Sequence, residues 1–255
     1  MAIDTTKPHI GRIYDFMLGG HHNYEVDRQA AAQILKSAPT YPKWARVNRW
    51  FLQFVATEWE RQGRSQVLDL GTGLPTEGHF NELMPRARIL LSDNDPISVA
   101  YGEEILKNQP NMAYRLADIA RPETLTEQAT EFFGNNHNIA VACIGLVYLV
   151  PDSVVAALLR TLYDWCAPGS VMAMSFGTWV EGGNQANITA ALEAFWRQAR
   201  VRMCLRTTEE IAQLAAPWRM TAVKPLQEWL GVPDMFTREE LESAGGCMSG
   251  AFFER

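Results

Sequence analysis

The chain has 255 residues, 47% of them hydrophobic and 20% charged, with a net charge of −6 at pH 7, which excludes a disordered or fibrous protein. The acidic balance argues against a nucleic-acid partner, because binding a phosphate backbone needs clustered lysine and arginine. The longest apolar run, residues 139–150, is shorter than the roughly 20 residues that cross a bilayer. The first residues lack the apolar stretch of a signal peptide, and the four cysteines are widely spaced. We therefore expect a cytoplasmic protein with reduced thiols, no metal and no membrane partner, acting on a small molecule.

The first 63 residues are predicted to form a helical cap. Polar and aromatic residues fill the first 30 positions, and the Gly19-Gly20 pair breaks any helix there. A helix is expected over residues 28–35, followed by two interrupting prolines. Apolar residues then recur at three- and four-residue steps, which predicts a helix over residues 48–62 that ends at Gly63.

From residue 64 onward, short apolar runs alternate with amphipathic segments. The runs predict strands over residues 66–70, 88–92, 112–116, 139–144, 171–176, 220–223 and 250–253. The segments between them predict helices over residues 76–84, 96–106, 124–133, 153–166, 188–202 and 208–215. Strands alternating with helices predict an α/β fold, in which a seven-stranded, mostly parallel sheet carries helices on both faces. Residues 64–255 are expected to form one compact unit.

The loop after the first of these strands contains two glycines, Gly71 and Gly73, which let the backbone turn sharply and approach a ligand closely. The loop is not a dinucleotide fingerprint, because Thr76 stands where a third glycine is needed, and it lacks the lysine of a phosphate loop. Asp69 precedes the glycines and would repel phosphate, so it suits a cationic ligand. Taken alone, such a loop is often only a turn.

Acidic residues also follow the next two strands. Asp93 and Asn94 come twenty residues after Gly73, where a carboxylate can accept hydrogen bonds from ribose hydroxyls. Asp118 can accept from the amine of adenine, and Ile119 can cover a ring face. Either aspartate alone could be a helix N-cap. Because the carboxyl ends of parallel strands meet in one crevice, ribose, adenine and a cationic group together predict S-adenosylmethionine (SAM) as the cofactor.

Five motifs carry a resemblance to a known family: RIYDFMLGG (residues 12–20), HNYEVDR (22–28), Asn48-Arg49, LDLGTGLPT (68–76) and DNDP (93–96). The chain resembles the class I SAM-dependent methyltransferases over residues 64–255. Over nearly its whole length it resembles a bacterial S-adenosyl methyltransferase family that was once classed as a domain of unknown function. The resemblance implies a Rossmann-like class I fold and methyl transfer from SAM, with Thr72 beside the cofactor in the glycine loop.

The polar cluster in the first 28 residues has two interpretations. One is a solvated loop and helix. The other, favoured by the resemblance, is a lid over the cofactor in which Gly19 and Gly20 provide flexibility. In the lid, Arg12 and Tyr14 are expected to contact the cofactor, and an arginine can bind the methionine carboxylate with bidentate geometry. Arg49 is the rival candidate for that carboxylate.

The acceptor and the oligomeric state are not predicted by the sequence. Methyl transfer rests mainly on alignment of donor and acceptor, and His22 and Tyr148 are the candidates for a general base if the acceptor needs one. His79 is expected on a helix surface. Two alternatives stay open: a non-catalytic SAM-binding regulatory protein without an acceptor pocket, and an NAD-dependent oxidoreductase, which Thr76 and Asp69 disfavour.

Overall fold

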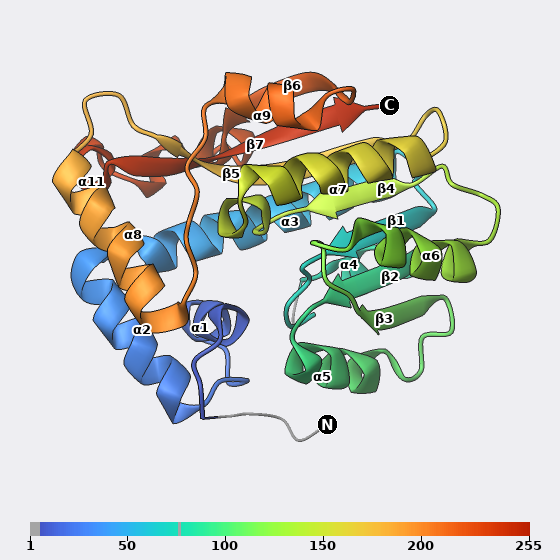
Figure 1. The fold of residues 1–255 in the computed structure, drawn as a ribbon, viewed down its shortest axis with the longest axis horizontal. Helices are drawn as coiled ribbons and strands as arrows, with labels where there is room; N and C mark the ends of the chain where they lie inside the picture. Colours follow the sequence, from blue (N-terminus) through green and yellow to red (C-terminus); the bar gives the residue numbers. More distant parts are fainter. Residues whose placement is uncertain (1–5, 76–77) are drawn as a thin grey trace.

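A seven-stranded sheet in the order β3-β2-β1-β4-β5-β7-β6 forms the centre of the molecule (Figure 1). The computed structural model describes residues 6–75 and 78–255. The strands are β1 (Gln66–Leu70), β2 (Arg88–Asp93), β3 (Met112–Leu116), β4 (Ala140–Cys143), β5 (Val171–Trp179), β6 (Arg219–Pro225) and β7 (Gly246–Glu254). The first five pair in parallel, and β7 runs antiparallel to both β5 and β6. The prediction of a seven-stranded, mostly parallel sheet is confirmed.

Helices cover both faces of the sheet. On one face lie α3 (Tyr41–Arg61), α4 (Phe80–Leu83), α5 (Pro96–Leu106) and α10 (Leu226–Trp229). On the other lie α6 (Pro122–Phe133), α7 (Asp152–Trp165) and α9 (Thr208–Ala215). Every residue of β1 is buried, with Val67 packing toward the first helical layer and Leu68 toward the second. Because both faces of these parallel strands are buried, their sequences are continuous apolar runs and do not alternate between apolar and polar residues.

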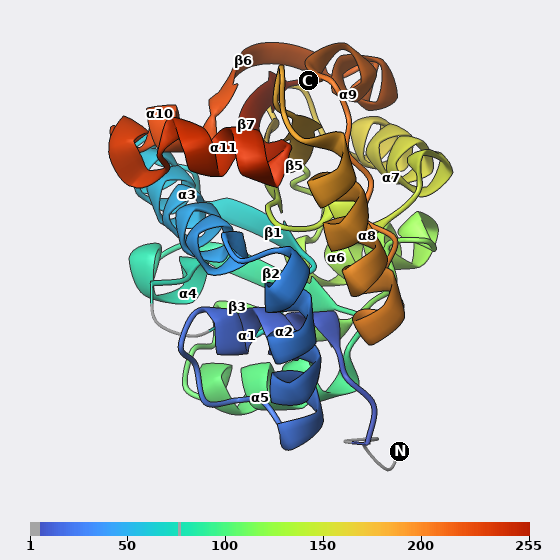
Figure 2. The same ribbon diagram turned by 90° about the vertical axis from the view of Figure 1, so that its left-hand side faces the viewer.

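A helical cap stands over the carboxyl ends of the parallel strands. It contains α1 (Ile10–Met17), α2 (Glu25–Ser37), the start of α3 and also α8 (Gln185–Ala199), which lies beside α2 (Figure 2). The cap has its own core, in which Ile13 and Ile34 share a cluster with Phe195 of α8. The cap therefore combines the N-terminal segment with the segment between β5 and β6, whereas the sequence indicated only the first.

Some local predictions were wrong. Residues 10–17 form α1 ahead of the glycine pair, although we expected no helix there. Pro42 does not interrupt a helix but lies in the first turn of α3, where its missing N–H needs no partner. Of the helix expected over residues 76–84, only α4 is helical among the described residues, and Thr76 and Glu77 lie outside them. Short helices also follow β6: α10, a 3-10 turn over Pro233–Met235, and α11 (Arg238–Ala244).

The described residues contain no helix with the length and hydropathy of a membrane span. Nor do His, Cys, Asp and Glu side chains in residues 6–75 and 78–255 gather into a group of three that could hold a metal ion.

Candidate functional site

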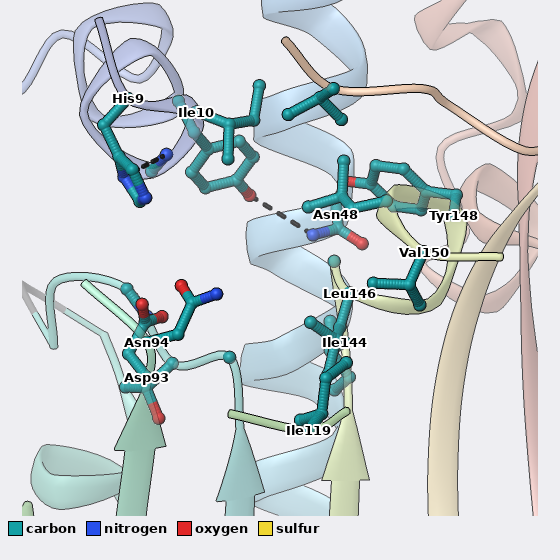
Figure 3. A pocket seen from close by; sticks show the side chains of 18 of the residues that line it. His9, Ile10, Asn48, Asp93, Asn94, Ile119, Ile144, Leu146, Tyr148 and Val150 are labelled. Atoms are coloured by element: carbon teal, nitrogen blue, oxygen red, sulfur yellow. Dashed lines mark hydrogen bonds between the residues drawn. The ribbon is translucent and has the colours of Figure 1, made fainter. Parts of the chain in front are cut away.

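A cavity of about 520 Å³ opens at the carboxyl ends of β1 to β4, below α1 and beside α3; we call it the strand-end cavity. Its volume falls within the range of small-molecule sites. Figure 3 shows His9 and Ile10 on one side of the space and Asp93 and Asn94, at the end of β2, on the other. The parallel sheet thus brings its loops together on one side of the cavity, and the cap covers the opposite side.

The glycine loop after β1 forms part of the wall. Gly71 and Gly73 both have φ near +62°, a left-handed backbone that favours glycine. A Cβ at Gly71 would lie 2.6 Å from Leu146 Cδ1, so this glycine is needed for packing. A Cβ at Gly73 would meet no described heavy atom within 4 Å, so the backbone here borders open space.

Asp93 anchors that loop from the end of β2. Its carboxylate accepts the N–H groups of Gly73 and Asp95, each at 2.8 Å. Burial raises the pKa of Asp93, and the two backbone N–H groups oppose that effect. A carboxylate has about four acceptor positions, so two remain for a ligand. Asn94, which is exposed, also lines the cavity.

The loop after β3 supplies the third predicted contact. Asp118 and Ile119 both line the strand-end cavity, so the structure brings them together with Asp93. Asp118 accepts the N–H of Ala120 at 3.0 Å, which fixes the turn. Ile119 is 9% exposed and turns toward the cavity (Figure 3).

Beneath the glycine loop lies a buried polar pair. Asp69 accepts the hydroxyl of Thr72 at 2.7 Å, and burial raises the pKa of Asp69 to about 7. His79, expected on a helix surface, is instead buried, with Nε2 3.8 Å from Asp69 Oδ2. Burial and the nearby Arg49 charge hold the pKa of His79 well below its ordinary value, so the ring is neutral. Its Nδ1 has no hydrogen-bond partner among the described residues.

Arg49 of α3 lines the same cavity. Its Nη1 is buried and has no hydrogen-bond partner within the described part of the chain. A buried guanidinium nitrogen without an acceptor is unfavourable, and each such group in a native protein calls for an explanation. An anionic ligand group in the strand-end cavity would satisfy it.

The N-terminal candidates divide into two groups. Tyr14 lines the cavity, and its hydroxyl donates to the Ala45 carbonyl at 2.9 Å. Arg12, by contrast, is not one of the described residues that line the cavity; it is buried in an ion pair with Asp27 at 2.9 Å. Arg12 also donates to the Lys7 carbonyl, so its guanidinium is committed to holding α1 against α2.

The glycine pair of the predicted lid makes room for a buried acid. Neither glycine is among the described lining residues of the strand-end cavity. Gly19 has a φ of +84°, and a Cβ at Gly20 would lie 2.1 Å from Asp15 Oδ1. The carboxylate of Asp15 accepts the backbone N–H of His22 and the side-chain amide of Asn23. The pair therefore shapes the turn between α1 and α2.

The two candidate bases differ in position. The ring of His22 packs edge-on against Tyr101, and His22 is not among the described residues around the cavity. Tyr148, in a 3-10 turn after β4, lines the cavity and is 4% exposed. Burial raises the pKa of Tyr148 well above its ordinary value, so its hydroxyl stays protonated at neutral pH and suits hydrogen bonding better than proton abstraction.

Among the cavity residues that the sequence analysis did not assign to the site, two are polar side chains with notable contacts. His9 lines the cavity, and its Nδ1 lies 3.6 Å from Asp95 Oδ2. Asn48 donates to the Tyr14 hydroxyl at 3.3 Å and accepts the Ser175 hydroxyl at 2.6 Å, which links α1, α3 and β5. The sequence held a signal for Asn48, because it is a polar residue on the apolar side of a strongly amphipathic helix.

Comparisons with known proteins bear on the family and the fold of this chain. The S-adenosyl methyltransferase family model matches residues 1–240. A DUF574 family protein from Streptomyces avermitilis is similar over 100% of both chains, at 25% identity and a TM-score of 0.87. A candidate methyltransferase from Thermobifida fusca shares 27% identity at a TM-score of 0.83, over 99% of this chain and 96% of its own.

A more distant structure shares the fold alone. Magnesium protoporphyrin IX methyltransferase from Synechocystis, solved with S-adenosylhomocysteine (SAH) bound, has a TM-score of 0.56 at 12% identity, with 95% of this chain and 93% of that chain covered. No curated protein matches the chain.

Proposed function

Since this chain belongs to the S-adenosyl methyltransferase family and is a SAM-dependent methyltransferase, we propose that it methylates a small molecule and holds SAM in the strand-end cavity. Two features of the cavity fit the cofactor. The backbone at Gly73 borders open space, as close passage of a ligand requires, and the buried Arg49 Nη1 lacks an acceptor. The methionine carboxylate of SAM is such an acceptor.

Each part of SAM has a counterpart on the wall. Asp93, with two free acceptor positions, suits the ribose hydroxyls, and Asp118 with Ile119 suits adenine. Arg49 suits the carboxylate better than Arg12, because Asp27 already neutralises Arg12 inside the cap. When bound, SAM supplies a methyl group activated by the positive sulfonium.

Asp69 contributes electrostatically from below the loop. It is buried against Thr72 rather than exposed on the wall, and with a pKa of about 7 it is close to half ionised at neutral pH. A positive group beside the loop favours the ionised form, so cofactor binding and deprotonation of Asp69 are expected to be coupled.

The cap supplies the remaining requirements of the reaction. His9, Ile10 and Tyr14 close the cavity from the α1 side, which excludes water from the reacting groups. The chain of hydrogen bonds through Asn48 and Ser175 fixes α1 and α3 relative to the sheet, so donor and acceptor are held in alignment. The Tyr148 hydroxyl is available to bind the acceptor.

The unpartnered Arg49 Nη1 is the observation that carries this proposal. Calorimetry with SAM, SAH and NAD tests the cofactor: the first two are expected to bind at one site and NAD to show no binding. The protein is then incubated with SAM carrying a labelled methyl group and a metabolite extract. Label in the small-molecule fraction is expected, whereas label found only in protein or nucleic acid contradicts a small-molecule acceptor.

A further inference from the structure

A second cavity, of about 610 Å³, adjoins the first; we call it the α8 cavity. It lies between α8, the corner joining α2 to α3, α11, and the paired ends of β5 and β7. Its wall is largely apolar and aromatic and includes Trp44, Ile188, Leu192, Phe195, Met203 and Met248. Tyr41 and Tyr148 line both cavities, so the two spaces meet at these side chains.

The two shared tyrosines present hydroxyls that are free to bind a ligand. Tyr41 is 8% exposed and Tyr148 4%, and neither hydroxyl has a hydrogen-bond partner among residues 6–75 and 78–255. The Tyr148 hydroxyl is 3.8 Å from the position that a Cβ on Gly145 would occupy, just past the end of β4. It therefore lies where the α8 cavity adjoins the proposed cofactor site.

Charge in the α8 cavity is confined to its solvent side. The charged side chains on the described wall are Lys36, Lys43, Glu239 and Glu240. Lys36 and Glu239 are exposed, and Lys43 is paired with Glu240 at 2.6 Å. The inner end thus offers apolar surface and two neutral hydroxyls, with no charged group to compensate an ion.

This environment selects between nucleophiles. Burial in an apolar site disfavours charged forms, so it lowers the pKa of an amine and raises that of a phenol. A buried amine therefore keeps the neutral form, whose lone pair is nucleophilic. A buried phenol instead keeps its proton, and the hydroxyls of Tyr41 and Tyr148, whose pKa values burial raises, are unsuited to remove it.

We propose that the α8 cavity binds the methyl acceptor and that this acceptor is an uncharged amine carried on an aromatic or otherwise apolar body. The inference rests on the proposed function. The Tyr41 and Tyr148 hydroxyls accept the amine N–H and orient the lone pair. The nitrogen forms a bond to the methyl carbon while the carbon–sulfur bond breaks and its electron pair stays on sulfur. The proton now in excess on nitrogen leaves to water at the open end.

Matched probes test the proposal without knowledge of the natural acceptor. Tryptamine, tryptophol and tryptophan share one indole body and differ in carrying an amine, an alcohol or a zwitterion; phenethylamine, phenethyl alcohol and phenylalanine form a second set. Each is titrated by calorimetry into the protein saturated with SAH, over a range of pH. At least one amine is expected to bind, with affinity rising about tenfold per pH unit below the amine pKa.

Variants on α8 locate the bound probe. Leu192→Trp fills the α8 cavity from its wall, whereas Thr189→Trp adds the same side chain at an exposed position of the same helix. Leu192→Trp is expected to weaken amine binding at least tenfold with SAH binding unchanged, and Thr189→Trp to change neither. Tyr148→Phe should lower amine binding and labelled methyl transfer while SAH binds as before.

Each outcome decides the matter. The inference is overturned if no amine binds the SAH complex, if the zwitterionic amino acid binds as well as its amine, if the affinity for the amine is independent of pH, or if labelled methyl passes from SAM to the alcohol and not to the amine. It is also overturned if Leu192→Trp binds SAH and still binds the amine normally. Should Leu192→Trp lose SAH as well, the selectivity and pH profile of the unsubstituted protein still decide. Failure of SAH to bind the unsubstituted protein refutes the proposed function itself.

Discussion

Replacing Arg49 with methionine should separate cofactor affinity from stability. The buried Nη1 has no acceptor among the described residues, so the unbound protein loses no hydrogen bond at that atom when the guanidinium is removed. An unsatisfied buried donor costs about 1–3 kcal/mol, and its removal offsets the loss of the guanidinium's interactions with Tyr14 and Asp69, so the free energy of unfolding should change little. In the complex, loss of one partner of a buried charged pair costs about 2–5 kcal/mol, which corresponds to about 30-fold to several thousand-fold in affinity.

The ligand provides the internal control. SAH carries a homocysteine carboxylate that corresponds to the methionine carboxylate of SAM, whereas methylthioadenosine keeps adenine, ribose and sulfur but lacks this carboxylate. Calorimetry on Arg49→Met should therefore show a large loss of affinity for SAH and little for methylthioadenosine, with urea unfolding run in parallel. Arg46→Met, an exposed position on α3, is the matched variant and should behave like the unsubstituted protein. If Arg49→Met weakens both ligands equally, or neither, Arg49 does not bind the carboxylate.

Further predictions address the strand-end loops, the buried acid and the cap. Asp93→Ala should weaken SAM binding by about 1.5–3 kcal/mol in calorimetry, the range for hydrogen bonds to charged groups; unchanged affinity would refute a contact between Asp93 and the ribose. Gly73→Val should abolish SAH binding while circular dichroism shows an intact fold, because the added side chain enters open space that the ligand needs; normal binding would make the loop only a turn. For Asp69, burial holds the folded pKa near 7, above the unfolded value of 3.8, so stability falls as pH rises between these values and is lowest above 7. As pH rises across this range, Asp69→Asn should become more stable than the unsubstituted protein, by at most about 4 kcal/mol in urea unfolding. If the free energies of unfolding of the two proteins vary with pH in parallel, the pKa of Asp69 is not raised. Hydrogen exchange over residues 10–28 should slow when SAH binds; equal exchange with and without SAH would make this segment structural rather than a lid.

The sheet was predictable because burial on both faces leaves a direct signature in the sequence. The strands expected over residues 66–70 and 112–116 and the helix over 96–106 have the bounds that the structure shows. The seven-strand order could be inferred only through the family resemblance, since apolar runs do not specify their neighbours. Asp93 and Asp118 could be identified in the same way. Once a strand is recognised in the sequence, its carboxyl end is known too, and ligands of parallel sheets bind at that end.

The cap was harder to predict because long-range contacts stabilise it. Helix α1 has only eight residues and contains Gly11, so its own propensity is low, and burial of Ile13 and Met17 stabilises it. Membership of α8 in the cap depends on Phe195 packing against Tyr41, with ring centres 4.8 Å apart, a contact that no local pattern encodes.

Pairings between distant residues also decide which polar groups are available to a ligand. The sequence favoured Arg12 for the carboxylate, with Arg49 as its rival, and the structure reverses this preference because Asp27 of α2 neutralises Arg12. His79 was misplaced for a related reason, since a short helix gives too few positions to define a buried side, and its neighbour Asp69 comes from β1.

A crystal structure of the protein with SAH tests the central claim most directly. We expect SAH in the strand-end cavity, with the ribose hydroxyls on Asp93, adenine beside Ile119 and the homocysteine carboxylate on Arg49 Nη1, so that the sulfur faces Tyr148. A ligand bound outside this cavity, or one with its carboxylate away from Arg49, would contradict it.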